Sequence, residues 1–180
     1  MNSYKFAKFL EEIFFPPLSV SYFIVIMLLY FRSIEQFSVN FLALTILVVS
    51  FYSFVKVFYN KIKRKDTLFF LGLIISFLIF SLINYVMPVY KEFYLVTIAI
   101  LGAGIIAYAI RHYWKISAHM TSLTVSIISL AIINNMFIVF AILIPIVAWC
   151  RIKLKAHTYF QVIGGAILGI LMPLLVHFVF

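Results

Sequence analysis

Six stretches of the 180-residue chain contain no Asp, Glu, Lys or Arg, and this feature restricts the possible folds more than any other. The stretches are residues 13–31, 36–55, 67–90, 93–110, 120–150 and 158–180. A helix needs about 20 apolar residues to cross a bilayer. A soluble domain of this size, with 66% hydrophobic residues, would leave too much apolar surface in water. A membrane β-barrel would need alternating polar and apolar residues, which these stretches lack. We therefore expect an all-α, polytopic transmembrane helical bundle.

The uncharged run 120–150 is the one segment that allows two interpretations. As a single helix, its 31 residues would rise about 46 Å, well beyond a hydrocarbon core of about 30 Å. Asn134 and Asn135 lie at its middle, where a polar turn belongs. We predict two helices, 117–133 and 136–153, joined by a tight turn; one long tilted span is the alternative.

These choices give seven spans, or six if one of the short ones is re-entrant, in a single integral membrane domain of residues 1–180. A short amphipathic helix is predicted at residues 1–12, with Phe6, Phe9 and Leu10 on one side. The predicted spans are 17–32, 38–58, 67–87, 92–111, 117–133, 136–153 and 157–179.

The charged residues are few and unevenly distributed. Fourteen Lys and Arg against five Asp and Glu give a formal charge of +9. No carboxylate follows Glu92, so a carboxylate-bound metal centre is not expected. The single Cys150 gives neither a disulfide within the chain nor a metal cluster. We expect no cofactor and no nucleic acid partner, because nearly every cation flanks a span; membrane lipids are the expected partners.

Three basic clusters are predicted to share one membrane face. They comprise Lys61–Lys63–Arg64–Lys65, Arg111–His112–Lys115–His119 and Arg151–Lys153–Lys155–His157. The excess of cations predicts that this face of a multi-pass cell-membrane protein is cytoplasmic. The positive-inside rule accounts for lysines and arginines but not for histidines, so the two clusters that contain His are candidates for chemistry.

Two short motifs carry these histidines. In CRIKLKAHTYFQ, Arg151 precedes His157 by six positions, and Gln161 follows one helical turn after His157. In KISAHM, Ser117 and His119 are separated by one small residue. Each residue alone would be an interfacial or anchoring side chain. Their joint occurrence on one predicted face favours a phosphate site.

These motifs resemble those of the type 2 phosphatidate phosphatase superfamily, which includes the vanadium haloperoxidases. Arg151 and His157 agree with the family's Ser-Arg-x5-His-x3-Asp motif, with Cys150 in place of Ser and Gln161 in place of Asp. Ser117 and His119 agree with its Pro-Ser-Gly-His motif. The Lys-x6-Arg-Pro motif is matched only by Arg64, with Lys56 or Lys61 as substitutes for its lysine. The resemblance covers roughly 56–169.

The resemblance implies a metal-independent lipid-phosphate phosphatase that works through a phosphohistidine. His157 would be the nucleophile and His119 the general acid. Arg151, Arg64, Ser117 and Lys61 would hold the phosphate oxygens. Gln161 would orient His157 by accepting its ring proton, but without the charge of the family's carboxylate.

The expected substrate is a lipid phosphomonoester or diphosphate, and three candidates remain open: phosphatidate, phosphatidylglycerol phosphate and isoprenyl phosphates. Two other classes of function also remain open. One is a non-catalytic lipid-binding or scaffold protein of the same fold, and the other is a small transporter, which lacks support from any ionisable residue at mid-membrane. A homo-oligomer is left open by the sequence.

Overall fold

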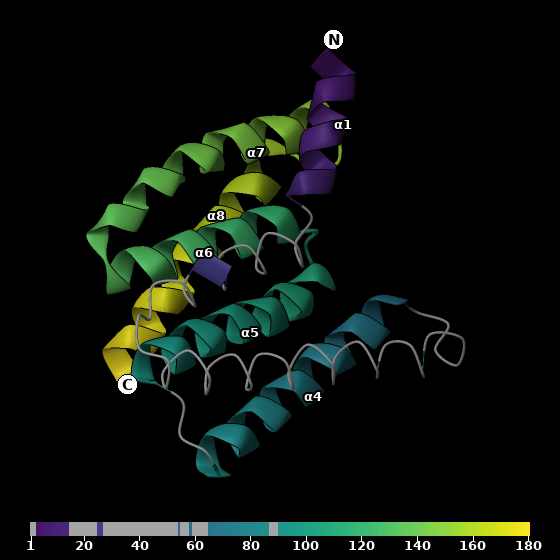
Figure 1. The fold of residues 1–180 in the computed structure, drawn as a ribbon. Coiled ribbons are helices and arrows are strands. Elements are labelled where there is room, and N and C mark those ends of the chain that lie inside the picture. Colours follow the sequence, from purple (N-terminus) through teal and green to yellow (C-terminus); the bar gives the residue numbers. More distant parts are fainter. Residues whose placement is uncertain (1–2, 15–24, 27–53, 55–57, 59–64, 87–89) are drawn as a thin grey trace.

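The computed structural model describes residues 3–14, 25–26, 54, 58, 65–86 and 90–180. Within them the fold is all-helical, as predicted (Figure 1). Six α-helices and one 3₁₀ helix are formed by these described residues. In chain order they are α1 (Ser3–Ile13), α4 (Lys65–Val86), α5 (Lys91–Arg111), α6 (Ala118–Ile133), η1 (Asn135–Ile142), α7 (Leu143–Lys153) and α8 (Tyr159–Val179).

Three helical segments in the described part of the chain are long and apolar enough to cross a membrane: Lys91–Arg111, Asn135–Lys153 and Tyr159–Val179. The apolar helix α6 is shorter, with 16 residues. The count of six to seven spans is therefore supported only in part. The predicted spans 17–32 and 38–58 lie almost entirely outside the described residues.

The run 120–150 forms a hairpin, which confirms the turn predicted at Asn134–Asn135. Asn134 ends α6 with an extended backbone, and its side-chain Oδ1 accepts a hydrogen bond from the Met136 amide at 2.9 Å. The returning arm begins as 3₁₀ helix, which rises about 2.0 Å per residue compared with 1.5 Å in an α-helix. The eight residues of η1 and the eleven of α7 therefore reach about 33 Å, close to the thickness of a hydrocarbon core.

Helices α6 and α8 run in the same direction and pack closely. Gly165 of α8 lies against the start of α6, where a Cβ atom would be 2.7 Å from the Ser117 carbonyl oxygen. Gly169, one turn later, lies against Thr121 and Val125, also one turn further along α6. This matched advance shows that both helices start at the same end of the bundle. The two glycines permit this close packing because they have no side chain.

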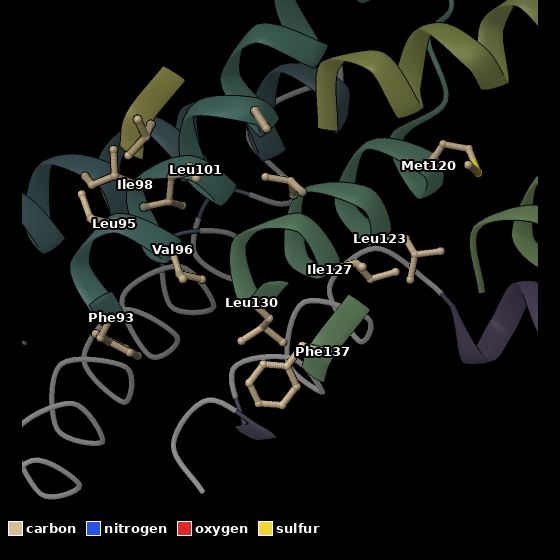
Figure 2. Packing of buried hydrophobic residues seen from close by; sticks show 14 of the residues in the cluster. Phe93, Leu95, Val96, Ile98, Leu101, Met120, Leu123, Ile127, Leu130 and Phe137 are labelled. Atoms are coloured by element: carbon tan, nitrogen blue, oxygen red, sulfur yellow. The ribbon is translucent and has the colours of Figure 1, made fainter. Parts of the chain in front are cut away.

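The hydrophobic core lies mainly between α5 and α6. Figure 2 shows side chains of both helices, with Phe137 of η1 beside Leu130 of α6. The interior is not purely apolar, because α6 also buries Thr121, Thr124, Ser126 and Ser129. α6 is therefore buried around much of its circumference, as expected for the central helix of a bundle.

Helix α1 packs on α7, although more than 120 residues separate them in sequence (Figure 1). The rings of Phe6 and Trp149 lie 6.4 Å apart in this contact, and Ala7 of α1 is completely buried. Phe6 and Phe9 remain 40% and 54% exposed, so α1 retains an apolar face that no described residue covers.

Candidate active site

The candidate site lies where the N-termini of α6 and α8 meet. The amide of Ser117, which precedes α6, donates a hydrogen bond to the Gln161 carbonyl oxygen in the first turn of α8 at 3.1 Å. Two helix N-termini thus lie together, and each presents unpaired amide hydrogens and a partial positive charge. Such a junction favours an anion.

A tight turn connects Arg151 to His157. Arg151 lies in the last turn of α7, and its carbonyl oxygen accepts a hydrogen bond from the Ala156 amide at 3.1 Å. The Lys155 amide donates to the Ile152 carbonyl at 2.9 Å, and Lys155 has a φ of 53°. These two bonds and the left-handed residue form a Schellman motif. The spacing of six positions is therefore the length needed to stop α7, reverse the chain and begin α8.

The site brings together Arg151, His119 and His157. Arg151 and His157 are both close enough to His119 to act on it electrostatically. Arg151 is buried, with 6% of its surface exposed, whereas both imidazoles are only partly buried. The site therefore combines two partly buried rings with a guanidinium that is shielded from water.

His157 is held in one tautomer by a backbone group. Its Nδ1 lies 3.2 Å from the Lys115 carbonyl oxygen, in the segment that leads into α6. Because a carbonyl can only accept, Nδ1 carries the proton and Nε2 presents the lone pair. Burial and the nearby Arg151 charge lower the pKa of His157, while the Lys115 carbonyl opposes this shift. The ring is therefore neutral at pH 7.

Gln161 makes two hydrogen bonds with Thr158, the N-cap residue of α8. The side-chain Oε1 of Gln161 accepts a hydrogen bond from the Thr158 backbone amide at 3.1 Å, and the Gln161 backbone amide donates to the Thr158 hydroxyl at 3.4 Å. This is a capping box, which satisfies two donors at the start of α8. The Gln161 side chain, as a hydrogen-bond acceptor, also raises the pKa of His157. Gln161 thus supports His157 without bringing a charge.

A hydroxyl oxygen and a guanidinium nitrogen near the site are buried and have no hydrogen-bond partner among the described residues. One is Ser117 Oγ, on a residue that is 0% exposed and whose side chain does not cap α6. The other is Arg151 Nε. Buried groups of this kind normally have partners, and both are suited to hold an oxyanion.

Glu11 of α1 is the residue that the sequence analysis missed. Its carboxylate forms an ion pair with Arg151 Nη1, across 140 positions of sequence. The composition limits the choice of partner for Arg151, because a buried arginine needs a counter-ion and the chain has only five carboxylates. Nothing in the local pattern, however, selects Glu11 among them.

The remaining candidates are placed as follows. Arg64 and Lys61 lie outside the described residues. His112 is exposed near the end of α5, with Nδ1 3.3 Å from the Tyr108 carbonyl oxygen, and His177 is exposed near the end of α8. Within the described ranges, no group of three or more His, Cys, Asp and Glu is arranged to hold a metal ion.

The described residues define an all-helical protein with three membrane-length helices and a polar site of two histidines and one buried arginine. No family model, curated protein or solved structure matches the chain.

Proposed function

We propose that this protein is a membrane lipid-phosphate phosphatase, which hydrolyses a lipid phosphomonoester or diphosphate through a phosphohistidine. The observation that carries the proposal is the convergence of His119 with Arg151 and His157, which come from two separate segments of the chain. A buried guanidinium supplies charge for the phosphate oxygens, and two imidazoles supply a nucleophile and an acid. The resemblance to type 2 phosphatidate phosphatases assigns the same residues to the same roles.

In the first step, the phosphate lies at Arg151, Ser117 and the two helix N-termini. His157 Nε2 attacks phosphorus, so that an N–P bond forms while the P–O bond to the lipid breaks. The leaving oxygen takes a proton from His119, which has received it from the incoming phosphate monoanion. The Lys115 carbonyl keeps the Nδ1 proton of His157 in place and thereby keeps Nε2 aimed at phosphorus.

In the second step, water attacks phosphorus and the N–P bond breaks. His119, now neutral, accepts the proton of the attacking water. Inorganic phosphate leaves, and His157 returns to its neutral tautomer. Arg151 offsets the charge that spreads over the phosphate oxygens in both steps.

The proposal places the protein in the cell membrane as a multi-pass protein, with this site at the cytoplasmic surface. The three membrane-length helices support membrane residence. Exposed cations around the site, among them Lys153 and Lys155, are suited to contact headgroups while their stems cover apolar surface. Lipid tails would then lie along the apolar helices and present only the headgroup to the site.

A second candidate function is binding of a lipid phosphate without turnover. The observation that favours it is the pairing of Gln161 with Thr158, since an uncharged, shared amide stabilises a cationic His157 less than a carboxylate would. This function uses the same anion site, so binding alone does not separate the two candidates.

Phosphate release from purified protein separates them. We expect release from at least one of phosphatidate, phosphatidylglycerol phosphate, isoprenyl phosphate and isoprenyl diphosphate, with the same rate in the presence of a chelator. An acid-labile ³²P-labelled protein should accumulate when the reaction is quenched early. His157→Ala should lower turnover by at least about 10³-fold, because it removes the nucleophile.

The matched control is His112→Ala, which removes an exposed histidine at the same end of the bundle and should leave turnover unchanged. Binding of a lipid phosphate without any phosphate release would favour the second candidate. Release that survives in His157→Ala would remove His157 from the mechanism.

A further inference from the structure

Arg151, which would bind the phosphate, already has a partner in the structure. Arg151 is the only charged side chain that the described residues bury, and its Nη1 is already paired with Glu11. A carboxylate therefore stands beside the group that would bind the phosphate. Glu11 itself is more accessible, with 34% of its side chain exposed compared with 8% for Arg151.

The helix that carries Glu11 is poorly suited to keep that position by itself. Glu11 and Glu12 lie in the last turn of α1, where the helix dipole disfavours negative charge. An eleven-residue helix is also short enough to be marginal when it is not packed. The ion pair with Arg151 offsets this unfavourable interaction. It places both the Glu11 carboxylate and the negative end of the α1 dipole next to a guanidinium. Docking of α1 and neutralisation of Arg151 are thus one event.

Resting on the function proposed above, we infer that Glu11 is an internal competitor for the anion site. While α1 is docked, the Glu11 charge offsets Arg151 and repels a phosphate dianion. A phosphate that reaches Arg151 displaces Glu11, and α1 loses the contact that stabilises its docked position. Glu11 therefore sets the affinity of the site for its substrate, and α1 acts as a gate.

Binding of inorganic phosphate to the full-length protein tests this competition. Glu11→Gln removes the competing charge, so the dissociation constant for phosphate should fall at least about tenfold, equivalent to about 1.4 kcal/mol. Glu12→Gln makes the same charge change at an exposed neighbouring position and should leave the constant unchanged. Equilibrium dialysis with ³²P-phosphate measures all three proteins. Equal or weaker binding by Glu11→Gln, or no binding by it, would overturn the inference.

Glu11→Gln leaves a buried arginine without its counter-ion and therefore carries a risk of misfolding. The unmodified protein provides a second measurement through Cys150, which is its only cysteine. This residue is 1% exposed, precedes Arg151 in sequence and lies within electrostatic reach of Glu11. If phosphate releases α1, it should speed the reaction of Cys150 with a water-soluble thiol reagent. Sodium chloride of equal ionic strength is the control, and an unchanged rate would contradict the gate.

The two proposals fail in different ways. Tighter phosphate binding by Glu11→Gln together with no phosphate release from any lipid would refute the phosphatase and leave the competition intact. Turnover by the unmodified protein together with an unchanged phosphate affinity in Glu11→Gln would refute the gate and leave the phosphatase intact.

Discussion

The contact between α6 and α8 and the contact between α1 and α7 both border the site, yet they are built differently. In the first, backbones touch: Gly165 and Gly169 bring α8 against main-chain atoms of α6, and the Ser117 amide bonds directly to the Gln161 carbonyl. The second includes side-chain interactions, namely the Phe6–Trp149 ring pair and the Glu11–Arg151 ion pair.

The difference indicates that the two helix contacts have separate roles. Close-packed backbones have no side-chain freedom with which to adjust, so the α6–α8 contact fixes the relative positions of His119 and His157. An ion pair responds to competing anions, so the α1–α7 contact can change without disturbing that geometry. Reacting groups are thus held by the rigid contact, and access to Arg151 is governed by the adjustable one.

Breaking the rigid contact should have the largest effect on stability. In Gly169→Ala, the new methyl group would lie 2.9 Å from both the Thr121 carbonyl oxygen and the Val125 backbone nitrogen. Because these are backbone atoms, we expect a loss of about 1–3 kcal/mol and reduced turnover. Thermal unfolding in detergent measures the loss.

Gly164→Ala is the matched control for this change. Its methyl group would lie 2.6 Å from the Trp114 ring, a side chain that is 41% exposed and free to move aside. A larger loss in Gly164→Ala than in Gly169→Ala would contradict the view that backbone contact makes the α6–α8 interface rigid.

Breaking the adjustable contact should cost less. Ala7 is 0% exposed, so Ala7→Leu adds bulk at the buried position of α1 and favours undocking of this helix. We expect Cys150 to react faster with a thiol reagent, while the midpoint of global unfolding moves by less than in Gly169→Ala. Lys8→Leu, at an exposed position on the same helix, is the control. A fall in the unfolding midpoint as large as that of Gly169→Ala would show that the two contacts do not differ in kind.

The pH dependence of phosphohistidine formation tests the environment of His157, which the α6–α8 contact holds in place. Burial and the Arg151 charge lower the pKa of His157 from its ordinary value of 6.5. Attack needs the neutral ring, so at limiting substrate concentration, where the pH profile reports the free protein, the rate should fall with a midpoint below pH 6.5 as the pH decreases. Rapid-quench measurements with ³²P-labelled substrate give the profile. Loss of the rate with a midpoint at or above pH 6.5 would show that His157 is not shielded as described.

The smallest expected effect concerns the turn between Arg151 and His157. Lys155 has a φ of 53°, which costs a residue with a Cβ about 1 kcal/mol. Lys155→Gly should therefore stabilise the protein by about 1 kcal/mol. Lys155→Ala removes the same charge but keeps the Cβ, and it should give no such gain in thermal unfolding.

Much of the fold could be predicted because its signals are local. The uncharged runs predicted the positions of α4, α5 and α8, and the two asparagines at the middle of residues 120–150 predicted the hairpin turn. The length of η1 was not predictable, because hydropathy does not distinguish a 3₁₀ helix from an α-helix.

The sequence by itself determined which residues are apolar enough to form membrane helices. It also determined which polar residues lie close together because a single turn between two helices connects them. Arg151 and His157 belong to that class, since one turn connects them. Only the tertiary structure decided that Lys115 supplies the acceptor for His157 and that Glu11 pairs with Arg151. Both partners are distant in sequence, and periodicity carries no information about which of several like groups a folded chain brings into contact.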